Sequence, residues 1–101
     1  MIKVIVKRDN DIISNINVIG HAEYDEKGKG IVCASVSSML IITVNGIIEF
    51  DKNSISYEEK NEFKLTNLKK DDITNKLLNN LVNHLKELEL KYKKNINIRE
   101  E

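Results

Sequence analysis

The sequence predicts an α+β domain in which two strand pairs alternate with two helices, in the order ββαββα. Segments with alternating apolar and polar residues occur in pairs, at residues 1–19 and 54–66, and a period of two is typical of half-buried strands. Each pair is followed by a longer segment with helical character, the first apolar nearly all round and the second with an apolar stripe. This order indicates a largely antiparallel sheet packed against the two helices.

A single domain accounts for residues 1–101, because a chain of this length has room for one hydrophobic core. Basic and acidic residues number 16 each, so the formal net charge is zero. Nucleic-acid-binding domains usually carry a basic excess on one face, and we therefore expect no direct nucleic-acid partner. The single cysteine and the absence of a signal-peptide pattern at the start suit a reducing cytoplasm.

The first strand pair is predicted at residues 1–9 and 12–19, joined by the turn-forming Asp-Asn-Asp at 9–11. The apolar faces of the two strands are expected to consist of Ile2, Val4 and Val6, and of Ile12, Ile16 and Val18. After this hairpin, residues 22–30 form a glycine-containing loop, which we expect to be flexible and to open and close over a substrate.

A helix is predicted from about Ile31 to about Phe50. Residues 31–48 contain no charged side chain and reach the minimum length for a membrane span. Several serines and other polar or small residues interrupt the segment, and the hairpins need an apolar partner. We therefore expect a helix buried on more than one side, with no membrane partner.

A second hairpin is predicted from "SISYEE" and "EFKLT", which turn around Lys60-Asn61. Asp71-Asp72 provide an N-terminal cap and a favourable charge for a long helix. The buried stripe of this helix is expected to be Ile73, Leu77, Leu81, Leu85, Leu88 and Tyr92. "INIRE", at 96–100, alternates again and can add a short last strand.

Cys33 and His21 are the candidates for chemistry. A helix start and a nearby cation both favour the thiolate form of a cysteine, as does partial exposure. We place Cys33 in the first turn of the apolar helix, where unpaired N–H groups can also stabilise an oxyanion. His21, at the end of a strand, can then take the thiol proton and return it to a leaving amine.

Non-catalytic interpretations of the cysteine and the histidines remain open at this point. A free cysteine is often simply a small buried hydrophobic residue. One cysteine and one histidine fall short of the four ligands of a structural zinc site. The second histidine, His84, lies beside the apolar stripe of the long helix and is expected to be a boundary residue without a catalytic part.

The sequence around the pair resembles a known family. Gly-His-Ala at 20–22, a glycine-bearing loop and "IVCASVS" at 31–37 are similar to the ribosomal-processing cysteine proteases called Prp, or YsxB-like proteins. The resemblance covers essentially the whole chain. It implies a cytoplasmic bacterial endopeptidase that removes the N-terminal extension of large-subunit ribosomal protein number twenty-seven during ribosome assembly. It also implies a homodimer, with no cofactor required.

The resemblance assigns the catalytic pair to Cys33 and His21. Ser37 matches the family serine one helical turn after the cysteine, and Gly20 and Gly28 match the glycines that bracket the loop. The family commonly has Asp three residues before the cysteine, whereas this chain has Gly30. The pair is thus left without an obvious third member.

Three loop acids, Glu23, Asp25 and Glu26, are the candidates for that third role, and they can also attract a basic peptide. Two other functions stay open. One is a non-catalytic binding or assembly protein of the same fold, and the other is a thiol acyl transferase.

Overall fold

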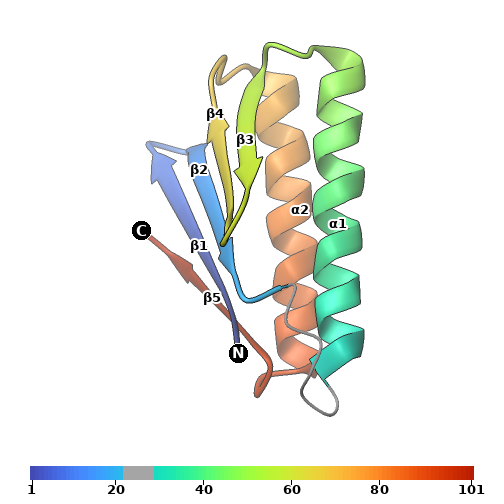
Figure 1. Cartoon of the computed structure of the whole chain (residues 1–101). Helices are drawn as coiled ribbons and strands as arrows, with labels where there is room; N and C mark the ends of the chain where they lie inside the picture. Colours follow the sequence, from blue (N-terminus) through green and yellow to red (C-terminus); the bar gives the residue numbers. More distant parts are fainter. Residues whose placement is uncertain (22–28) are drawn as a thin grey trace.

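The elements of the protein follow the predicted order, with a further strand after the second helix (Figure 1). The structure is a computed structural model and describes residues 1–21 and 29–101. Its elements are β1 (Ile2–Asp9), β2 (Ile12–Ile19), α1 (Lys29–Phe50), β3 (Ile55–Glu59), β4 (Phe63–Asn67), α2 (Asp72–Lys91) and β5 (Ile96–Glu100). The α+β class predicted from the sequence is confirmed.

The five strands of the described residues form one sheet in the order β3-β4-β2-β1-β5. Every neighbouring pair is antiparallel except β1 and β5, which run parallel. The two helices lie side by side against one face of the sheet (Figure 1), which gives the two-layer arrangement expected of this class. A radius of gyration of 13.0 Å fits a compact globular domain of this length.

A β-bulge changes the apolar face of β2. Lys7 pairs with Asn15 while Arg8 pairs with Ile13, so that Ser14 is an extra residue in the ladder. The bulge moves Ile13 to the buried face and leaves Ile12 only half-buried. The prediction that Ile12 belongs to the core was therefore wrong.

The shifted backbone at Ile13 is held by two asparagines. Its N–H donates to Asn75 Oδ1 of α2 at 2.9 Å, and its carbonyl accepts from Asn67 Nδ2 of β4 at 2.9 Å. Buried backbone groups need such partners, because an unmet donor or acceptor is costly. These contacts tie the bulge to both layers of the domain.

Helix α2 begins as predicted. Asp71 is the N-cap, and its Oδ1 accepts from Thr74 N–H at 2.8 Å. Hydrogen bonding from Thr74, first from its side chain and then from its N–H, lowers the pKa of Asp71. The buried residues of α2 are Thr74, Leu78, Leu81, Val82 and Leu85.

The predicted stripe of α2 was therefore correct for Leu81 and Leu85 only. Ile73 is 43 % exposed, and the other three residues lie half-buried at the edge. The buried face is rotated because α2 packs both on the sheet and on α1. A spacing of three and four residues does not distinguish between these adjacent faces.

Helix α1 starts at Lys29, so two residues of the predicted loop are helical. Its buried face consists of Val32, Cys33, Val36, Leu40, Val44 and Ile47. On its opposite face the three isoleucines Ile31, Ile41 and Ile42 are each more than half exposed. The expectation of burial on more than one side was wrong, because a two-layer fold covers only one side of α1.

In the described part of the chain, Gly30–Phe50 is the one helical segment long and apolar enough to cross a membrane by length and composition. The same segment packs against α2 and supplies part of the core. Its buried face belongs to the globular domain.

Candidate active site

Gly20 turns the chain from the end of β2 toward α1. Its φ of +88° lies in the left-handed region that residues with a side chain rarely adopt. A Cβ at this position would lie 3.2 Å from the carbonyl oxygen of Met1, which is tighter than ordinary contact. Glycine is therefore required here on two grounds, and the turn places His21 beside α1, where it is only 6 % exposed.

Both ring nitrogens of His21 have partners. Nδ1 lies 2.9 Å from the Oγ of Ser37 on α1, and Nε2 lies 2.5 Å from Oε1 of Glu59 at the end of β3. The Ser37 hydroxyl is also placed to donate to the backbone carbonyl of His21, at 3.5 Å. The ring is thus held between a helix and a strand that follow it in the sequence.

Cys33 lies on the side of α1 that contacts His21, and close to the turn at Gly20. Its Sγ is placed to donate to the carbonyl oxygen of Gly20 at 3.9 Å. Ser37 follows four residues later, a spacing that puts the two β-carbons roughly 5–6 Å apart on one helix face. The structure therefore brings Gly20, His21, Cys33 and Ser37 together beside one face of α1.

Two details of the cysteine differ from expectation. Cys33 has no exposed surface, whereas partial exposure was predicted; the side chain faces the core of the domain. It is also the fifth residue of α1. Its N–H is then the first that can reach a carbonyl within the helix, and the unpaired N–H groups lie just before it.

The remaining sequence candidates lie apart from this cluster or outside the described residues. Gly28 and the loop acids Glu23, Asp25 and Glu26 lie outside the described residues. Gly30 lies in α1, and a Cβ there would meet nothing within 4 Å, so the backbone leaves room for a side chain at this position. His84 is exposed on α2, with Nδ1 2.8 Å from the carbonyl of Asn80.

Glu59 was not found by sequence reasoning. Its contact with His21 depends on how two hairpins are placed side by side, which no local pattern encodes. The acidic pair "EE" at 58–59 within a predicted strand was the available signal. Alternation puts its two side chains on opposite faces of the strand, so that one of them turns toward the helices.

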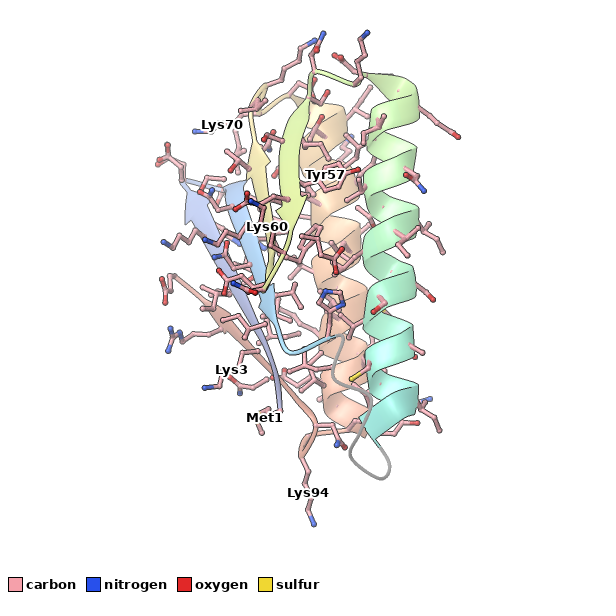
Figure 2. The ribbon with its side chains drawn as sticks, viewed as in Figure 1. Met1, Lys3, Tyr57, Lys60, Lys70 and Lys94 are labelled. Atoms are coloured by element: carbon pink, nitrogen blue, oxygen red, sulfur yellow. The ribbon has the colours of Figure 1, made fainter. Side chains whose placement is uncertain are left out.

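Two hollows flank the contact between His21 and Glu59. A pocket of about 90 Å³ is lined by Ile19, Gly20, His21 and the turn from Glu59 to Glu62. A second, of about 210 Å³, lies between α1 and the β3–β4 hairpin and is lined by Leu40, Ile41, Val44, Asn45, Tyr57, Glu59 and Phe63. Figure 2 shows the side chain of Tyr57 directed from β3 toward α1.

The second hollow is mostly apolar, and two aromatic side chains form part of its lining. The rings of Tyr57 and Phe63 stack with centroids 6.4 Å apart, and Phe63 is almost fully buried. A concave apolar surface beside a few polar groups is the usual form of a binding site. Within residues 1–21 and 29–101, no group of three or more acidic, histidine or cysteine side chains is arranged to hold a metal ion.

Comparison with known proteins defines the class of this enzyme as a cysteine protease. The family model described as "Cysteine protease Prp" matches residues 1–97, and the chain belongs to that family. No curated protein matches the chain at a significant level.

Solved structures share the fold over the full chain. A Staphylococcus aureus ribosomal processing protease Prp in complex with a substrate peptide is 24 % identical, with a TM-score of 0.92 and complete coverage of both chains. A structure of the same S. aureus protease with a covalently linked product peptide is 25 % identical, with a TM-score of 0.89 and the same coverage. A Streptococcus mutans protein is 20 % identical over 99 % of this chain and 93 % of its own, with a TM-score of 0.87.

Proposed function

We propose that this cysteine protease uses Cys33 as its nucleophile and His21 as its general base. We further propose that its substrate is the N-terminal extension of large-subunit ribosomal protein number twenty-seven. The observation that carries the proposal is the placement of both residues on one side of α1. Cys33 Sγ lies against the carbonyl of Gly20, and the ring of the next residue, His21, contacts Ser37 one turn after Cys33.

The chemistry follows the usual course for a thiol nucleophile. His21 takes the proton of Cys33, and Sγ attacks the carbonyl carbon of the scissile peptide bond. The oxyanion is stabilised by N–H groups at the start of α1. When the C–N bond breaks, His21 gives its proton to the leaving amine, and a thioester remains on Cys33. Water activated by His21 then hydrolyses the thioester and restores the thiol.

Because Cys33 is fully buried, its surroundings must open before a peptide can reach the sulfur. The apolar hollow beside Glu59 supports peptide binding next to this point. The S. aureus relative was solved with a substrate peptide and with a covalently linked product peptide, which supports the same chemistry here. A ribosomal substrate made in the bacterial cytoplasm is consistent with the proposed cytoplasmic location.

The test is cleavage of a synthetic peptide that carries the ribosomal extension. A general base contributes about 10²–10⁴-fold in rate, and without the thiol no covalent intermediate can form. We therefore expect Cys33→Ala and His21→Ala to abolish measurable cleavage. His84→Ala is the matched control, because that exposed histidine contacts the carbonyl of Asn80 within its own helix, α2. Tight binding of the peptide by the wild type without cleavage would contradict the proposal. Transfer of the acyl group to an added amine in preference to water would instead identify an acyl transferase.

The exposed apolar face of α1 supports a homodimer. Ile31, Ile41 and Ile42 are exposed on a helix that has no charged residue between Ile31 and Ile48. Exposed apolar side chains that gather on one face of a domain commonly mark an interface. A second copy of the chain would cover this face with an identical one, as in the two-fold dimers that are commonest among oligomers.

Sedimentation of the purified protein tests this part of the proposal. We expect the wild type to sediment as a dimer and Ile42→Glu to sediment as a monomer, because the charge would be buried in the interface. Leu68→Glu is the control, since Leu68 is also exposed but lies after β4 and is not part of the exposed face of α1. A monomeric wild type at micromolar concentration would rule out the homodimer.

A further inference from the structure

We propose that Glu59 is the positioning residue that orients His21 and selects its tautomer, in the place of the acid that the chain lacks at Gly30. This inference rests on the proposed role of His21 as general base. It assigns a function to a residue on the β3–β4 hairpin, far in sequence from the histidine and from the cysteine.

The contact itself is close and specific. Glu59 Oε1 lies 2.5 Å from His21 Nε2, and the imidazole is only 6 % exposed. An ionised carboxylate accepts hydrogen bonds but cannot donate them. The proton of a neutral His21 ring must therefore be on Nε2. The basic lone pair is then on Nδ1, which faces α1.

The tautomer that Glu59 selects is the one that the thiol needs. Nδ1 lies 2.9 Å from the Oγ of Ser37, and Ser37 shares a helix face with Cys33 four residues earlier. The Ser37 hydroxyl can donate to Nδ1 or to the His21 carbonyl. When the hydroxyl turns to the carbonyl, Nδ1 is able to accept the proton of Cys33.

The register of the sheet explains why Glu59 reaches His21. On β4, Phe63 pairs with Glu59 on one side and with Val18 of β2 on the other. Phe63 is almost fully buried and anchors this row. Glu59 is thus fixed beside the last residues of β2, immediately before Gly20 turns the chain toward α1.

Alternation along β3 distinguishes Glu59 from its neighbour. Glu59 lies on the same side of β3 as Tyr57, and both line the hollow against α1. Glu58 points to the opposite side and is exposed. The pair offers a matched comparison, since replacing either glutamate by glutamine changes the net charge by the same amount.

The experiment measures cleavage of the extension peptide by Glu59→Gln, Glu59→Asp and Glu58→Gln. A glutamine can donate to Nε2 and so favours the wrong tautomer, an effect that costs about 10⁴-fold in the fully buried triad of serine proteases. Because Glu59 is partly exposed, we expect a smaller loss of kcat in Glu59→Gln, about 10–100-fold, with KM nearly unchanged. Glu59→Asp should retain more activity than Glu59→Gln, and Glu58→Gln should match the wild type.

A spectroscopic measurement separates positioning from a general structural effect. In protein labelled with ¹⁵N-histidine, the ring nitrogen shifts report which nitrogen carries the proton, and His84→Asn assigns the second ring. For the neutral form of the His21 ring, we expect the Nε2–H tautomer in the wild type and in Glu58→Gln. In Glu59→Gln we expect a mixture of tautomers, with an unchanged circular dichroism spectrum.

The positioning role of Glu59 and the general-base role of His21 are contradicted by different results. Wild-type kcat and an unchanged tautomer in Glu59→Gln would overturn the role of Glu59, while an inactive His21→Ala would leave the proposed base intact. Faster cleavage by Glu59→Gln would also overturn it, since Glu59 would then restrain the ring. Full activity of His21→Ala would remove the proposed function itself.

Discussion

The imidazole of His21 and the carboxylate of Glu59 meet across two hairpins, with Nε2 and Oε1 2.5 Å apart. The contact joins the end of β2 to the end of β3, and it leaves the other side of the ring turned to α1. The candidate site is therefore assembled from three elements. A strand end supplies the base, a helix supplies the thiol and the serine, and the β3–β4 hairpin supplies a carboxylate.

Ser37→Ala should slow cleavage without unfolding the protein. The change removes the hydroxyl 2.9 Å from His21 Nδ1, and a hydrogen bond between neutral groups is worth about 1 kcal/mol. We expect kcat to fall by about five- to tenfold, as measured with the extension peptide. Ser38→Ala is the control, because Ser38 is exposed on the adjacent position of α1. Equal rates for the two variants would mean that Ser37 does not help to hold the ring.

Gly20→Ala should destabilise the domain and disturb the site together. An alanine at φ +88° costs about 1–2 kcal/mol, and its Cβ would press on the carbonyl of Met1. The carbonyl of Gly20, which accepts from Cys33, would move as well. We expect a lower Tm and a loss of cleavage.

Gly46→Ala is the matched change for Gly20→Ala. Gly46 is exposed within α1, and a Cβ there meets nothing within 4 Å. Alanine should stabilise the helix by about 0.5–1 kcal/mol and leave the cleavage rate unchanged. A stable and active Gly20→Ala would show that the left-handed turn is not required.

Asp71→Ala should lower the Tm near neutral pH, because the cap of α2 is lost. Asp71→Asn should retain most of the stability, since asparagine also caps helices. The pKa of Asp71 is lowered in the folded state, chiefly by the hydrogen bond to Thr74. The charged form of Asp71 therefore contributes fully to the free energy of unfolding above the unfolded-state pKa of 3.8. This contribution is lost as the pH falls through the lower pKa of the folded state.

Thermal melts of wild type and Asp71→Ala at several pH values test this pH dependence of the stability. The difference in Tm should be constant around neutral pH and should shrink below about pH 4. A difference that grows as the solution becomes more acidic would contradict the assignment of Asp71 as a charged cap.

Local patterns in the sequence were sufficient for the class and order of the elements. The alternation in residues 1–19 and the Asp71 cap are local features, and both are found where they were expected. Which individual side chains point into the core was less predictable. The bulge that exchanges Ile12 for Ile13 depends on Asn67 and Asn75, which lie on β4 and α2.

The site could be predicted in part for the same reason. Cys33 and His21 stand in a recognisable local sequence, and Ser37 follows from helical spacing. Glu59 could not be found, because its contact depends on the pairing of β2 with β4 and of β4 with β3. The burial of Cys33 was also missed, since the side of α1 that faces the core is decided by packing and not by residue type.

The most direct test of the central claim is to trap the covalent intermediate. Wild-type protein is mixed with the extension peptide, quenched in acid during the first turnover and weighed by intact mass spectrometry. We expect a mass increase equal to the N-terminal fragment, located on Cys33 and absent from Cys33→Ala. Cleavage by Cys33→Ala at the wild-type rate, or an adduct on another residue, would contradict the account.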